Sequence, residues 1–118
     1  MNILKNLANM IRGDAKRLTD GRFQLTFQNG SESGFCYNLH IDDRKVVEES
    51  IEIDGKVMLT REGEVGNIRD LTSGDLKEIE PPPDKLTLHV RRDKKEHPYF
   101  EDLYSWADTY SGFAFSSH

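Results

Sequence analysis

The fold is decided by residues 22–60, which read RFQLTFQNGSESGFCYNLHIDDRKVVEESIEIDGKVMLT. In several runs of this stretch, apolar side chains occupy every second position and polar side chains stand between them. One run is centred on Leu25 and the next on Tyr37. Period-two alternation sends successive side chains to opposite faces of a strand. The pattern therefore predicts an antiparallel sheet with one apolar face and one polar face.

Turn signals divide this stretch into consecutive strands. Residues 54–55 (DG) predict a tight hairpin, because such a turn needs positive φ and glycine adopts it freely. Residues 42–44 (DDR) predict another turn, and residues 29–34 (NGSESG) a longer loop. Residues 48–50 (EES) interrupt the alternation, which indicates a bulge or an edge strand.

Helical patterns flank the sheet. Residues 2–17 carry apolar side chains at helical spacing on one stripe, which predicts a helix lying on the apolar face. Residues 98–107 predict a second helix, since a proline suits the first helical position. Between them, residues 68–79 indicate a short helix with turns, and residues 85–92 alternate like a further strand. Residues 110–115 predict either a last strand or a tail that docks on a partner.

These elements predict a single α+β domain over residues 1–118, with an N-terminal helix, an antiparallel sheet of about five strands and a C-terminal helix. The formal net charge of −5 argues against nucleic acid and against an anionic membrane surface as partners. No apolar run is long enough for stable membrane insertion. Because Cys36 is the single cysteine, a reducing, cytoplasmic location is expected.

Motifs for catalysis are absent from the sequence. The four histidines show no zinc-ligand spacing, and neither a nucleophile elbow nor a phosphate-binding glycine loop occurs. The paired carboxylates at residues 42–43 lack the regular ligand spacing and the glycine of a calcium loop. We therefore expect no enzyme activity, no cofactor and no bound metal.

The order of elements resembles the sterol-carrier-protein type-two family. The segments that carry the resemblance are LKNLANMIRG (residues 4–13), DGRFQLTFQNG (20–30), GFCYNLHIDDRKVVEE (34–49), KVMLTREGEVGNIRDLTSGDL (56–76) and KLTLHV (85–90). In that family a helix precedes a strand meander, and a Leu-x-x-Gly-x-Leu turn follows an "xLT" strand. Here that turn is residues 71–76.

The resemblance implies a carrier of lipids or other small apolar ligands in a tunnel between sheet and helices. The wall of that tunnel would be the apolar sheet face, which also suits an ordinary core. Its residues are Phe23, Leu25, Phe27, Phe35, Tyr37, Leu39 and Ile41. The sequence departs from the family at residues 77–83 (KEIEPPP), where the family has apolar helical residues. The segment 93–118 has no counterpart.

An alternative function is an acidic protein-binding module of the inhibitor or immunity type. The net charge and the acidic pair Glu48-Glu49 favour a basic protein as its partner, because acidic surfaces steer basic partners. The aromatic C-terminal segment either completes the core or forms an interface, for which a two-fold homodimer is the commonest arrangement. The interface residues would be Trp106, Tyr110, Phe113 and Phe115.

Overall fold

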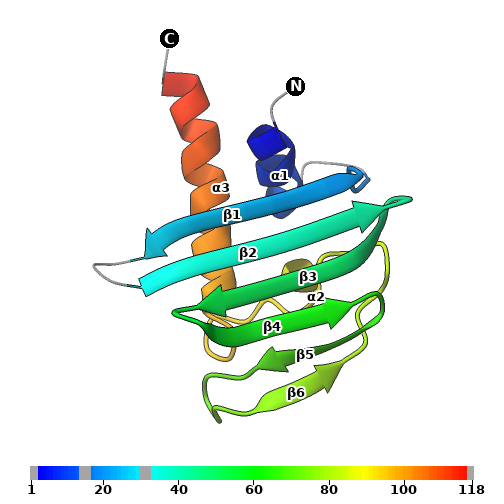
Figure 1. Ribbon diagram of the computed structural model, residues 1–118. Helices are drawn as coiled ribbons and strands as arrows, with labels where there is room; N and C mark the ends of the chain where they lie inside the picture. Colours follow the sequence, from blue (N-terminus) through cyan, green and yellow to red (C-terminus); the bar gives the residue numbers. More distant parts are fainter. Residues whose placement is uncertain (1–2, 14–16, 30–32, 117–118) are drawn as a thin grey trace.

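The computed structural model describes residues 3–13, 17–29 and 33–116, with side chains described for 4–13, 17–27 and 34–109. Three helices and six strands are formed by these residues (Figure 1). In chain order they are α1 (Ile3–Arg12), β1 (Gly21–Asn29), β2 (Ser33–Asp42), β3 (Lys45–Ile53), β4 (Lys56–Glu62), β5 (Val65–Arg69), β6 (Leu76–Ile79), α2 (Thr87–Val90) and α3 (Tyr99–Ser116).

The strands form one antiparallel meander in the order β1-β2-β3-β4-β5-β6. This confirms the predicted α+β class, with six strands in place of about five. The short helix expected at residues 68–79 was wrong, because Ile68 and Ile79 are buried on neighbouring strands β5 and β6. The strand expected at residues 85–92 was also wrong. There the three consecutive residues Leu86, Thr87 and Leu88 are all buried at α2, which a strand exposed on one side does not allow.

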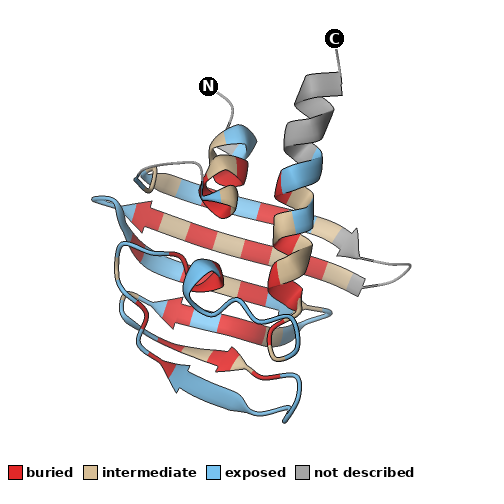
Figure 2. Cartoon of the chain, turned by 180° about the vertical axis from the view of Figure 1, so that it is seen from behind, coloured by how far each residue is buried: buried red, intermediate tan, exposed pale blue. Residues whose placement is uncertain are grey.

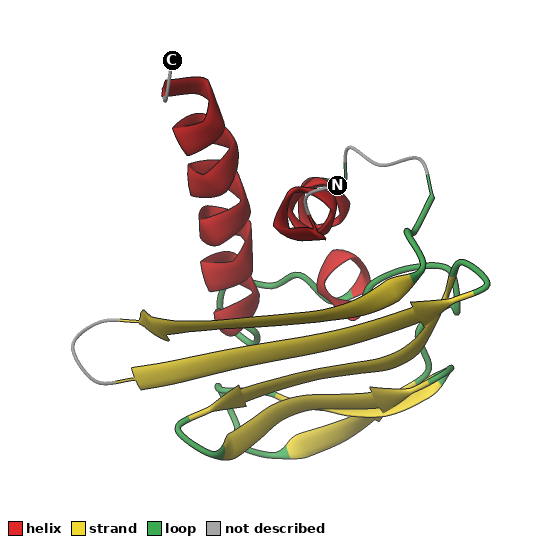
Figure 3. Cartoon of the chain, turned by 45° about the horizontal axis from the view of Figure 1, so that its top comes forward, coloured by secondary structure: helices red, strands yellow, loops and turns green. Residues whose placement is uncertain are grey.

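All three helices lie on the same face of the sheet (Figures 2 and 3). The buried apolar side chains of the strands point toward these helices, and Leu7, Ile11, Phe100 and Leu103 meet them from the helix side. Figure 2 shows the buried residues between the two layers. The other face of the sheet carries no helix among the described residues. The predicted division into an apolar and a polar face is therefore confirmed.

Both terminal helices differ in length from the sequence expectation. Helix α1 ends at Arg12 because Gly13 adopts a φ of +82°, a left-handed conformation that ends a helix. The predicted continuation at residues 14–16 lies outside the described residues. Helix α3 continues to Ser116, so the expectation of a separate strand or tail at residues 110–115 was wrong.

Positive φ in the turn at residues 54–55 was predicted from the sequence and is confirmed. Asp54 and Gly55 have φ values of 53° and 80° between β3 and β4. Between β2 and β3, Asp43 and Arg44 have φ values of 53° and 59°, which are unusual for non-glycine residues. The Asp20 carboxylate accepts hydrogen bonds from both of their N–H groups, at 3.2 Å and 2.7 Å. These two bonds offset the conformational cost of that turn.

Gly55→Val should lower the free energy of unfolding by about 1–3 kcal/mol, because a β-branched residue resists positive φ. A Cβ at Gly55 would meet nothing within 4 Å, so the loss measures backbone conformation alone. Glu64→Val is the matched control, because Glu64 lies in the β4–β5 turn and does not have a positive φ. Urea denaturation of both variants checks this. Equal midpoints for the two would contradict the assigned turn.

Candidate functional site

The predicted ligand wall lies in the layer between sheet and helices. Six of its seven side chains are buried, with exposed fractions of 7% or less, and Phe27 is half-buried. Tyr37 at the centre of β2 is fully buried. Phe27 and Phe35 stack with ring centroids 4.7 Å apart at one end of the layer. The strands do bring the seven residues together on one face, and the helices cover that face.

The residues of the predicted interface all belong to α3. Trp106 is half-buried and packs against the core cluster. The side chains of Tyr110, Phe113 and Phe115 lie outside the described side chains. The interface therefore stays a prediction.

A buried ion pair crosses the covered face at the middle of the sheet. Glu49 on β3 and Arg61 on β4 are register partners, and their side chains have no exposed surface. One guanidinium nitrogen of Arg61 lies 3.2 Å from a carboxylate oxygen of Glu49. A buried charge pair is costly unless further hydrogen bonds satisfy both partners. Such bonds are present on each side.

Glu49 receives two further hydrogen bonds. The Tyr37 hydroxyl donates to Oε2 at 2.8 Å, and the main-chain N–H of Thr87 donates to Oε1 at 2.9 Å. Burial and the adjacent Glu49 carboxylate raise the pKa of Tyr37 well above its ordinary value. The tyrosine therefore remains a donor throughout the neutral range.

Arg61 donates to the main chain of the segment that follows the sheet. Its Nη2 donates to the carbonyl of Pro82 at 2.7 Å, and its Nη1 to the carbonyl of Lys85 at 2.7 Å. Its Nε donates to the carbonyl of Gly63 at 2.7 Å. The pair therefore fixes the proline segment and α2 against the sheet, which is a structural role.

Sequence analysis missed this ion pair and took residues 48–50 as an interruption. The β2–β3 register does shift, but at Val47 and not within residues 48–50. Strand β3 is an inner strand, so the expected edge was wrong, and Glu49 belongs to the covered face. One signal was available. Glu49 is in phase with the apolar Ile51, and Arg61 is in phase with Leu59, so two opposite charges occupy core positions on strands joined by one hairpin.

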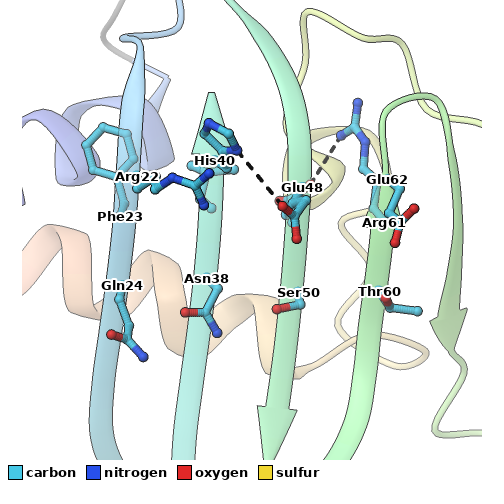
Figure 4. A pocket seen from close by; sticks show the side chains of 12 residues that line it. Arg22, Phe23, Gln24, Asn38, His40, Glu48, Ser50, Thr60, Arg61 and Glu62 are labelled. Carbon is cyan, nitrogen blue, oxygen red and sulfur yellow. Dashed lines mark hydrogen bonds and ion pairs between the residues drawn. The ribbon is translucent and has the colours of Figure 1, made fainter. Parts of the chain in front are cut away.

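The open face of the sheet carries two rows of polar side chains across β1 to β4 (Figure 4). The first row is Arg22, His40, Glu48 and Glu62. The second row is Gln24, Asn38, Ser50 and Thr60. A depression of about 550 Å³ lies along them. A second depression of about 630 Å³ borders Thr26, Cys36 and Glu52 further along the strands.

His40 lies in the middle of the charged row. Its Nδ1 is 4.0 Å from a carboxylate oxygen of Glu48, which is a loose pair. That nitrogen is buried and makes no hydrogen bond within the described residues. Glu48 is largely exposed, and Glu62 lies beside it on β4. The row therefore presents the Arg22 guanidinium on β1, the His40 imidazole on β2 and carboxylates on β3 and β4.

A second buried carboxylate, Asp70, lies in the connection between β5 and the edge strand β6. Its Oδ1 accepts from the Thr72 hydroxyl at 2.6 Å and from the Thr72 N–H at 2.8 Å. Its Oδ2 accepts from Lys77 Nζ at 2.9 Å. The Thr72 and Lys77 donors hold the pKa of Asp70 far below its ordinary value. This group closes the last hairpin.

Comparison with known proteins gives no family, curated relative or solved structure that matches the chain. Within the described residues, no three or more His, Cys, Asp or Glu side chains are grouped to hold a metal ion. No described helix has the length and apolar character needed to cross a membrane.

Arg61→Met should lower the free energy of unfolding by about 3–5 kcal/mol, because it leaves the buried Glu49 carboxylate without its cation. The double variant Glu49→Leu/Arg61→Met should recover part of this loss by removing the isolated charge. It cannot recover all, since the Pro82 and Lys85 carbonyls also lose a donor. Chemical denaturation of both variants checks the order. A double variant less stable than Arg61→Met would contradict it.

Asp70 should make stability depend on pH in the acid range. Since its pKa is lowered by folding, its contribution is present above the unfolded value of about 3.9 and is lost as pH falls below it. The wild type should therefore lose more free energy of unfolding between pH 5 and pH 2 than Asp70→Asn. Thr72→Val, which removes one donor, should give an intermediate slope. Identical slopes in urea titrations would contradict this role.

Proposed function

We propose that this protein is a non-catalytic binding module of the acidic inhibitor or immunity type, which uses the open face of its sheet to bind a basic protein. One observation carries the proposal. The apolar face is covered by helices and packs into one buried core, whereas the opposite face presents rows of charged and hydrogen-bonding side chains along a depression. A partner protein finds donors, acceptors and charge there.

The open face has properties suited to such binding. Strands β2, β3 and β4 are each hydrogen-bonded on both sides, so their backbone is fixed before binding. Its carboxylates, which include Glu48, Glu52 and Glu62, outnumber its arginine and lysine residues, Arg22 and Lys45, on strands β1 to β4. An acidic patch on a chain of net charge −5 accelerates encounter with a basic partner.

The carrier function implied by the family resemblance has less support. A ligand beside Tyr37 or Leu39 would need space where α1, α2 and α3 now pack. The seven apolar residues pack in the core between the sheet and the helices, which suits a structural role. A carrier would have to open its helices to bind, which the acidic module does not require.

The double variant Glu48→Lys/Glu62→Lys should reduce the association rate with a captured basic partner at least tenfold at low salt, since it reverses the charge on β3 and β4. Asp84→Lys/Asp108→Lys makes the same change in net charge at two exposed residues outside the open-face rows and should bind like the wild type. Quantitative affinity capture identifies the partner, and surface-binding kinetics at two salt concentrations measure the rates.

Two results would contradict the proposal. One is a partner whose association rate is unchanged in Glu48→Lys/Glu62→Lys or is insensitive to salt. The other is saturable binding of a fluorescent fatty acid to the wild type, unaffected by this double variant, which would favour the carrier instead.

A further inference from the structure

The outer edge of β1 is a strand edge without a neighbour among the described residues. We propose that this edge binds an extended segment of another protein as an added antiparallel strand. This inference goes beyond the proposed use of the open face. It concerns main-chain groups at the rim of the sheet, which pair with another backbone.

Hydrogen bonds at Gly34 show which groups of β1 point outward. The N–H of Gly34 donates to Asp54 Oδ1 at 2.7 Å, and its carbonyl accepts from the Asp54 N–H at 2.9 Å. Both main-chain groups of Gly34 therefore point toward β3. Neighbouring residues of a strand direct these groups to opposite sides, so Phe35 and every second residue after it point toward β1.

The register then assigns each residue of β1. Phe27, Leu25 and Phe23 face Phe35, Tyr37 and Leu39, so they form the hydrogen-bonded pairs with β2. The residues between them direct their N–H and C=O groups away from the sheet. They are Arg22, Gln24 and Thr26.

The two edges of the sheet differ in how they are protected. Strand β6 has only four residues, LKEI, two of them charged, and three prolines follow shortly after it. Short length, charge and proline are features that prevent pairing at an edge. Strand β1 has nine residues, GRFQLTFQN, with one charge and no proline. Its register with β2 runs without a shift along its whole length.

The helix layer indicates what kind of strand fits. Helices α1 and α3 both extend past β1 on the covered side (Figures 1 and 3). An added strand would lie beneath them, and its alternate apolar side chains would continue the rows of Phe23 and Leu25. A second whole copy, related by a two-fold axis, would bring its own helices into the same space. The occupant is therefore an extended segment with alternating apolar and polar residues.

A fluorescent peptide that copies residues 21–29 is a suitable probe. Its pattern is nearly symmetric about Leu25, so antiparallel pairing sets the peptide's Phe27 against Phe23 of the protein and its Leu25 against Leu25. A peptide of the same composition with its apolar residues contiguous is the control. Fluorescence anisotropy should show saturable binding of the first peptide with a Kd below about 100 µM, and at least tenfold weaker binding of the second.

Thr26→Pro tests the edge itself. The variant removes an outward N–H that the monomer does not use, and an edge strand tolerates proline at such a position. The peptide should bind it at least tenfold more weakly.

Glu78→Pro is the matched control on β6. Glu62 and Val65 are register partners that flank a two-residue turn, so the main-chain groups of Val65 point toward β4. Main-chain groups alternate in direction along a strand, so those of Gly66 and Ile68 point toward β6. The main-chain N–H and C=O groups of their partners Ile79 and Lys77 therefore point toward β5, and those of Glu78 point away from the sheet. Peptide affinity should be unchanged in this variant.

Hydrogen exchange of the wild type gives a readout that needs no variant. The peptide should slow exchange of the Arg22, Gln24 and Thr26 amides, with no such change at Glu78. Absence of saturable binding, equal affinity for Thr26→Pro, or protection confined to other strands would overturn the proposal. If Thr26→Pro does not fold, the exchange result alone decides. A wild-type dimer abolished by Thr26→Pro would overturn the choice of occupant in favour of a second copy.

Discussion

The Glu49–Arg61 ion pair is the interaction on which the rest of the structure depends. A charged pair in the core is tolerated only when the remaining donors and acceptors are satisfied. Here that requirement organises the chain after the sheet, because the Pro82 and Lys85 carbonyls and the Thr87 N–H are the groups that satisfy it. The proline segment and α2 are held against the sheet by hydrogen bonds as well as by apolar packing. Helix α3 then starts from a fixed position.

The two faces of the sheet are specialised in different ways. The covered face carries the apolar core and the buried pair, and its side chains cannot change without loss of packing. The open face carries polar and charged side chains outside the packed core, so its composition is free to match a partner. Strand β1 has two roles: it contributes Phe23 and Leu25 to the core, and it forms one edge of the sheet.

Sequence reasoning predicted the parts of the fold that follow from local periodicity and turn chemistry. The alternation around Leu25 and Tyr37, the turn at residues 54–55 and the helix after Pro98 are of this kind. It failed at residues 85–92, because a short alternating run fits a strand as well as a buried helical turn. It also missed the role of Arg61, whose partners in the segment after the sheet, Pro82, Lys85 and Thr87, lie 21 to 26 residues away in the chain. The open-face rows depend on register, which two strand bulges shift.

The meander topology has a consequence for how the chain folds. Every strand pairs with its neighbour in sequence, so sheet formation proceeds through contacts of short sequence separation and low loop-closure entropy. The contact between the terminal helices is of the opposite kind, since Arg12 donates to the carbonyl of Ala107 across 95 residues. A chain emerging from the ribosome can therefore form the hairpins early. The apolar side of its sheet then stays only partly covered until α3, which follows all six strands in the chain, has been synthesised and docks beside α1.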